Sequence, residues 1–125
     1  MKLYLSPEVK IKDLKKSFEN SFPYLKIEFL KKSHLPEEGS PKKDIVTDSS
    51  SLIEVADVMR EGEIEIRPDQ TVAEVEQVFQ TKFYLPVQIF RKSNSVWIET
   101  TTTDNFTLEK QNKMGMEACG FCWLQ

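Results

Sequence analysis

Apolar positions at the start of the chain change from the period of a strand to that of a helix. Leu3 and Leu5 alternate with polar residues, which is the pattern of a half-buried strand. Pro7 ends this pattern, because proline has no N–H to donate to a strand ladder. Residues 26–32 are predicted to form a second strand. Between the two lies a stripe that would cover one face of a helix: Ile11, Leu14, Phe18 and Phe22.

The same pattern recurs 61 positions further along the chain. Ile64 and Ile66 correspond to the first strand and Pro68 to its end, and the strand over residues 87–92 follows after a one-residue deletion. The chain is therefore predicted to contain two strand–helix–strand units, residues 3–33 and 64–93. The second helical stripe consists of Val72, Val75, Phe79 and Phe83, and the ending Lys31-Lys32-Ser33 matches Arg91-Lys92-Ser93.

The segments outside the two units have their own signals. Residues 34–62 are predicted to form a polar loop and then a short helix that Ser51 and Glu54 cap. Ser93-Asn94-Ser95 suits a hairpin turn, and residues 96–102 favour a strand. A last helix is expected to start near Thr107 after a cap at Asp104 or Asn105. This added strand and helix span 96–118, residues 119–125 form a tail, and residues 1–125 make a single domain.

This order of elements predicts an α+β protein. Two split units fold naturally into a single, mostly antiparallel sheet with both main helices on one face, the ferredoxin-like arrangement, here with an extra C-terminal strand and helix. The alternative is a β-grasp-like sheet. The second unit resembles ubiquitin-like domains in its first strand, in the Thr71-Val72 helix start, in residues 87–90 and in residues 104–108. That resemblance covers under half of the chain and includes neither an opening hairpin strand nor a closing strand.

Charge is distributed unevenly along the chain. The net charge is −3, so the molecule as a whole does not attract nucleic acid. Residues 1–33 nevertheless carry a local +4, whereas residues 51–80 carry a local −6. The first residues lack the apolar core of a signal peptide, and no run approaches the roughly 20 apolar residues of a membrane span. The predicted location is the cytoplasm, with no membrane association.

Residues suited to catalysis are scarce. His34 is the single histidine, and the four glycines are isolated, which argues against histidine-based chemistry and against a phosphate-binding loop. We therefore predict no catalytic residues, no cofactor and no metal site. The exception is Cys119-Gly120-Phe121-Cys122, whose spacing resembles that of thioredoxin-like redox pairs. A thiol-redox protein that uses Cys119 and Cys122 is the alternative function.

One face of the predicted sheet combines aromatic and basic side chains. We expect it to bind a protein partner or a second copy of the chain, which predicts a small, non-catalytic, intracellular binding or adaptor domain. A second alternative is single-stranded nucleic acid, which stacks on aromatic side chains, although Glu28, Glu65 and Glu99 oppose phosphate. The predicted partner-binding residues are Tyr4, Leu30, Phe90, Trp97, Lys32 and Lys92.

Overall fold

The computed structural model describes residues 1–30, 50–52 and 60–119. Its strands are β1 (Lys2–Leu5), β2 (Leu25–Phe29), β3 (Gly62–Glu65), β4 (Val87–Ser93) and β5 (Val96–Glu99). Its helices are α1 (Ile11–Ser21), α3 (Val72–Phe83), α4 (Leu108–Ala118) and the 3₁₀ helix η3 (Thr101–Thr103). The strand–helix–strand pattern of both predicted units is confirmed. Of the predicted short helix, only its start at Leu52 lies within the described residues.

The two main helices begin differently. The Thr71 hydroxyl accepts a hydrogen bond from Glu74 N while the Glu74 carboxylate accepts one from Thr71 N, so the predicted capping box of α3 is confirmed. At the equivalent position, Lys10 precedes α1 and makes no capping bond with its side chain. Helix α3 ends at Phe83, and the next residue, Tyr84, has a left-handed φ of 58°.

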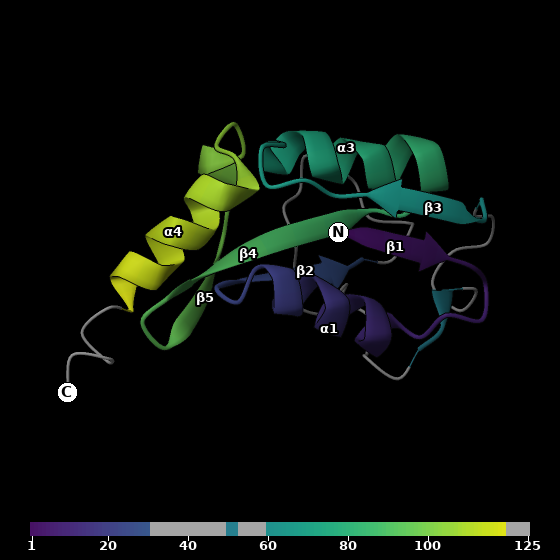
Figure 1. Ribbon diagram of the computed structural model, residues 1–125, viewed down its shortest axis with the longest axis horizontal. Coiled ribbons are helices and arrows are strands. Elements are labelled where there is room, and N and C mark those ends of the chain that lie inside the picture. The colour runs from purple at the N-terminus through teal and green to yellow at the C-terminus, as the bar shows by residue number, and fades with distance from the viewer. Residues whose placement is uncertain (31–49, 53–59, 120–125) are drawn as a thin grey trace.

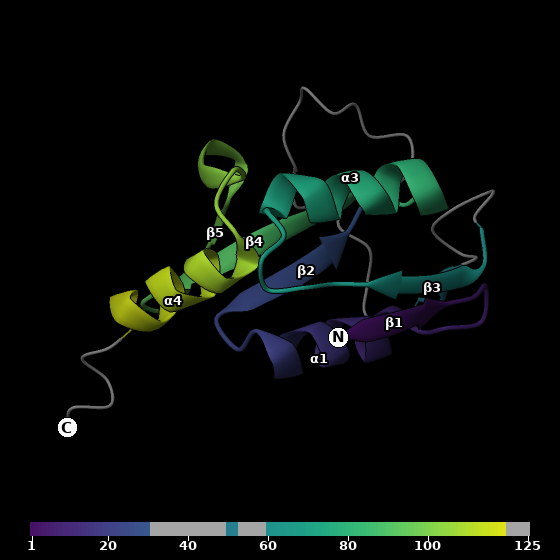
Figure 2. The same ribbon diagram turned by 45° about the horizontal axis from the view of Figure 1, so that its top comes forward.

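The strands form two antiparallel sheets where a single one was expected. Strand β1 pairs with β3, and β4 lies between β2 and β5. The α+β class is confirmed. Neither the ferredoxin-like nor the β-grasp-like arrangement, each built on a single sheet, is confirmed by this pairing. Helices α1 and α3 lie on opposite sides of the strands and not on one face (Figures 1 and 2). The physical reason is that β2 hydrogen-bonds to β4, its counterpart in the second unit, and not to β3.

Equivalent strands of the two units lie opposite each other. Leu3 faces its counterpart Ile64 in the first sheet, and Glu28 faces its counterpart Gln88 in the second. Both units contribute to one hydrophobic cluster, in which the rings of Phe29 and Phe79 meet edge to face with centroids 5.9 Å apart. The apolar stripes of α1 and α3 therefore pack into a shared core.

The chain leaves the three-stranded sheet earlier than predicted. Strand β5 ends at Glu99, and residues 101–103 form the 3₁₀ helix η3, so the strand predicted to continue to residue 102 is wrong there. The turn begins at Thr100, whose hydroxyl donates to Ile89 O at 2.8 Å and so occupies the place of the next ladder bond. The predicted hairpin turn is confirmed, since Ser93 pairs with Val96.

Helix α4 packs against β4 and the start of β2, at the end of the molecule that also carries the β4–β5 hairpin (Figure 1). Thr107, and not the predicted Asp104 or Asn105, caps it by accepting a bond from Lys110 N. A Cβ at Gly115 would lie 2.8 Å from Tyr24 Cβ, so glycine permits this close approach and the helix continues through it. No helix in the described part of the chain is both long and apolar enough to span a membrane.

Candidate binding surface

One face of the β2–β4–β5 sheet gathers aromatic rings and ammonium groups. The register places Lys26 beside Phe90 and Lys92 beside Trp97. The Lys26 ammonium lies 5.2 Å from the Phe90 ring centroid and 5.1 Å from that of Trp97. Lys92 Nζ lies 6.0 Å from the Trp97 ring. These distances are typical of cation–π contacts. Lys26, Phe90, Lys92 and Trp97 are called the aromatic–lysine cluster below.

A buried carboxylate holds the cluster in place. The Glu28 side chain is 8% exposed. Its carboxylate forms an ion pair with Lys15 Nζ at 2.7 Å and another with Lys26 Nζ at 3.2 Å. Two ammonium groups compensate the charge that burial would otherwise penalise. Glu28 thereby fixes the position of Lys26 between the two aromatic rings. Lys15 comes from α1, so the helix and the sheet face are linked through this carboxylate.

The structure brings together only part of the predicted binding residues. Phe90, Trp97 and Lys92 lie in the aromatic–lysine cluster, with Phe90 9% exposed and Trp97 partly exposed. Leu30 is 5% exposed and lies away from the cluster, along the groove described below. Tyr4 is 55% exposed but belongs to the other sheet, where its hydroxyl donates to the Glu61 carboxylate. Lys32 lies outside the described residues.

A groove lies between α3 and the start of β4. It has a volume of about 540 Å³, and the described residues that line it include no lysine or arginine. Burial raises the pKa of Glu76 to about 7, against a hydrogen bond from Ile89 N that lowers it, and the charges of Asp104 and Glu99 raise it further. The lining residues are Leu30, Ala73, Glu76, Gln77, Gln80, Pro86, Val87, Gln88, Thr101 and Asp104.

Sequence reasoning missed Glu76. The pattern of α3 marks Val75 and Phe79 as buried, and Glu76 stands beside that stripe on the helix. A carboxylate bordering an apolar stripe was therefore visible in the sequence. Its partner, the Ile89 N–H at 2.9 Å, was not visible, because the bond depends on where β5 leaves the sheet.

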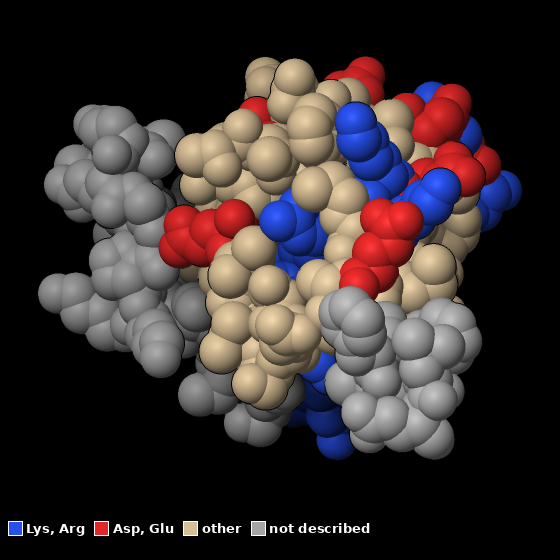
Figure 3. Space-filling model, turned by 90° about the vertical axis from the view of Figure 1, so that its left-hand side faces the viewer, with Lys and Arg blue, Asp and Glu red and all other residues tan. Residues whose placement is uncertain are grey.

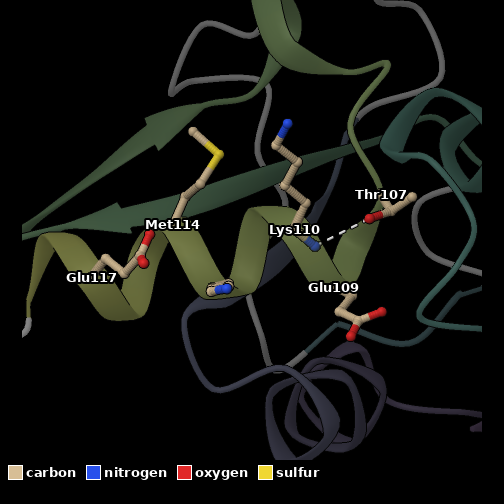
Figure 4. A pocket seen from close by; sticks show the side chains of 6 residues that line it. Thr107, Glu109, Lys110, Met114 and Glu117 are labelled. Atoms are coloured by element: carbon tan, nitrogen blue, oxygen red, sulfur yellow. Dashed lines mark hydrogen bonds between the residues drawn. The ribbon is translucent and has the colours of Figure 1, made fainter.

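A second hollow follows the outer face of α4 (Figure 4). Its volume is about 460 Å³, and the described residues that line it all come from this helix and its cap. Met114 contacts Arg91 Nη1 from β4 at 3.7 Å, and the Lys110 ammonium lies 4.0 Å from the Phe106 ring. Glu109 and Lys110 point in different directions in Figure 4, so charged groups do not converge on one point. We interpret this hollow as a solvated helix face.

The end of the molecule that carries α4 and the hairpin has a largely uncharged centre (Figure 3). Basic side chains emerge within it, and acidic side chains lie to either side. Val96 in the hairpin and Met116 in α4 are two of the three large hydrophobic side chains exposed among the described residues.

Of the two predicted redox residues, Cys119 lies directly after α4 and is buried, with its thiol donating to Asn94 O at 3.4 Å. Cys122 lies outside the described residues, so the distance between the two sulfur atoms is not defined. Within the described part of the chain, no three His, Cys, Asp or Glu side chains are grouped as a metal site requires.

Comparisons with protein-family models, with curated proteins and with solved structures returned no match.

Proposed function

We propose that this protein is a non-catalytic binding module that contacts a protein partner through Trp97 and the outer edge of β5, and that a second copy of the chain is that partner. The observation that carries the proposal is the partly exposed Trp97 ring, held beside two ammonium groups on an edge strand. Tryptophan is enriched among the side chains that dominate interface energies. The Glu28 carboxylate pairs with the Lys26 ammonium beside this ring and so fixes one of the neighbours of Trp97 before a partner binds.

The backbone of β5 supports a strand partner. Lys92 N donates to Tyr24 O on the β2 side, so the alternation of an antiparallel ladder turns Arg91 and Ser93 toward β5. Their partners in β5 are Ile98 and Val96. The N–H and C=O groups of Trp97 and Glu99 therefore face outward, along an edge that no described strand covers.

A second copy fits this edge by symmetry. If two β5 strands pair antiparallel with Ile98 on the twofold axis, the outward groups of Trp97 meet those of Glu99 in the other copy. Glu99 of that copy then lies on the same sheet face as Lys26 and Trp97, where its carboxylate complements the ammonium groups. The acids Glu28 and Glu99 on this face oppose phosphate, which favours a protein partner over nucleic acid.

We also propose that the chain is a duplication that extends beyond the two sequence units. Supporting it, Ile11 N donates to Ser50 O and Leu52 N to Val9 O at the start of α1. The counterparts at the start of α3 are Val72 N to Phe106 O and Leu108 N to Gln70 O. The helix start at Leu52 thus corresponds to that of α4, although the sequences of these segments show no match.

The test is light scattering after size exclusion, over a range of concentrations, on the wild type, Trp97→Glu and Val96→Glu. Val96 is 56% exposed on the same strand, but its side chain points to the opposite face, so it is the matched control. We expect a concentration-dependent dimer for the wild type and the control, and a monomer for Trp97→Glu. A wild type that stays monomeric at its highest soluble concentration would contradict the proposal. Phe90 is buried and unsuitable for a charge substitution.

A further inference from the structure

The groove between α3 and β4 exists because β5 pairs with only part of β4. Strand β5 covers Phe90–Ser93, and the chain then turns away at Thr100. The first residues of β4, Val87 and Gln88, keep β2 on one side and line the groove on the other. Helix α3 forms the opposite wall through Ala73, Glu76, Gln77 and Gln80.

The orientation of the backbone along this open edge follows from one bond. Leu30 N donates to Pro86 O at 3.0 Å, so the N–H and C=O of Val87 point away from β2. At Ile89, two residues further, the outward groups already have side-chain partners, Glu76 for the N–H and Thr100 for the C=O. For the N–H and C=O of Val87, no such partner is found among the described residues. A backbone pair of this kind needs a hydrogen-bonding group from elsewhere.

The charge of the groove selects what can enter. Glu76 and Asp104 line it, Glu99 is close enough to raise the pKa of Glu76, and the other polar side chains are neutral amides and Thr101. Among the described lining residues, an entering cation would meet the carboxyl groups of Glu76 and Asp104 and no ammonium group. The volume of about 540 Å³ lies within the range of ordinary ligand sites.

We infer that this groove binds a short extended peptide segment that carries a lysine or arginine. The segment lies between α3 and β4 as an added strand, exchanges backbone hydrogen bonds with Val87, and directs its basic side chain toward Glu76 and Asp104. Strand addition beside an exposed edge is a general mode of peptide recognition, in which backbone bonds give affinity and pockets give specificity. This site uses the part of the β4 edge that β5 leaves uncovered, whereas the proposed dimer uses the outer edge of β5, so neither proposal depends on the other.

The probe is an acetylated, amidated heptapeptide of alternating threonine and valine with a central lysine. Two matched peptides accompany it, one with a central glutamate and one with N-methyl groups on the backbone nitrogens adjacent to the lysine. Binding is followed by isothermal titration calorimetry and by the amide NMR signals of Val87 and Ile89. The protein variants are Glu76→Gln with Asp104→Asn, which removes the charges, and Trp97→Glu, which lies outside the groove.

We expect the lysine peptide to bind about tenfold or more tightly than the glutamate peptide and to shift the Val87 amide signal. N-methylation should abolish binding, because it removes the backbone donors. The double variant should lose the preference for lysine, whereas Trp97→Glu should bind as the wild type does. Absence of a Val87 shift, or equal binding of the N-methylated peptide, would overturn the inference. Loss of dimerisation in Trp97→Glu with intact peptide binding would separate the two proposals.

Discussion

The two strand–helix–strand units place opposite charges at one shared position. Lys15 on α1 and Glu76 on α3 are counterparts, as are Glu28 on β2 and Gln88 on β4. In the first unit, Lys15 pairs with Glu28 at 2.7 Å, and the contact joins two side chains. In the second unit, Glu76 instead accepts the Ile89 N–H at 2.9 Å and borders an open groove. The helix and the strand of the first unit are thus joined by an ion pair, whereas in the second unit the equivalent helix position carries a carboxyl group that borders a groove.

The two units share their buried apolar positions and differ in the polar positions at which a partner could bind. The buried apolar positions are shared between the units, and Phe18 and Phe79 are both fully buried. The features that differ are the polar side chains at the helix–strand contact and the presence of β5. The groove beside Val87 lies on the second unit, and the edge with Trp97 belongs to β5, the strand that directly follows this unit.

The largest expected effect tests whether the two units contribute equally to the core. Phe18→Ala and Phe79→Ala should each lower the free energy of unfolding by about 3–5 kcal/mol, because each leaves a cavity in the shared cluster. Denaturant unfolding followed by circular dichroism measures this. A loss of stability in only one of the two variants would contradict an equal contribution and show that one unit contributes most of the stability of the core.

The next effect concerns Glu76 alone. Burial raises its pKa to about 7 in the folded protein, above its usual value of 4.5. Its contribution to stability is therefore complete below pH 4.5 and is lost as the pH rises through 7. That loss should amount to about 3 kcal/mol from a shift of this size.

Chemical unfolding between pH 4 and pH 8 provides the measurement, with Glu76→Gln as the reference. Glutamine keeps an oxygen that accepts the Ile89 N–H but does not titrate. The wild type should lose stability relative to this variant as the pH rises. Parallel pH profiles for the two proteins would show that Glu76 titrates as an ordinary surface carboxyl.

The smallest effect compares the two helix starts. Thr71→Ala removes the capping box of α3 and should lower the free energy of unfolding by about 1 kcal/mol. Lys10→Ala, at the equivalent position before α1, removes no side-chain cap and should change it by less than about 0.5 kcal/mol. Thermal unfolding of both variants resolves the difference. A similar loss in both would mean that Lys10 has a structural role its backbone position does not show.

The sequence predicts most elements because local periodicity decides them. The stripes of α1 and α3, the Thr71 cap and the hairpin at Asn94 all depend on neighbours within a few residues. Sheet pairing depends on contacts between residues about sixty positions apart, so the division into two sheets was not visible. The threonine run after Glu99 shows the same limit: its composition favours a strand, yet Thr100 bonds to Ile89 and the chain turns.

The candidate surfaces were predictable in part for the same reason. Alternation along the strands placed Phe90, Trp97 and Lys92 on one face. It could not indicate that Phe90 is buried, because burial depends on what packs over the face. It also could not indicate the groove, which exists because β5 ends opposite Phe90 and leaves the first residues of β4 without a strand on that side.

The most direct test of the account is amide hydrogen exchange of β5 as a function of protein concentration. The outward N–H groups of Trp97 and Glu99 should exchange rapidly in dilute protein and become protected as a second copy pairs along this edge. Ile98, whose N–H already faces β4, should change little and serves as the internal reference. Exchange of Trp97 and Glu99 that is independent of concentration, while the chain is shown to associate, would contradict the proposed interface.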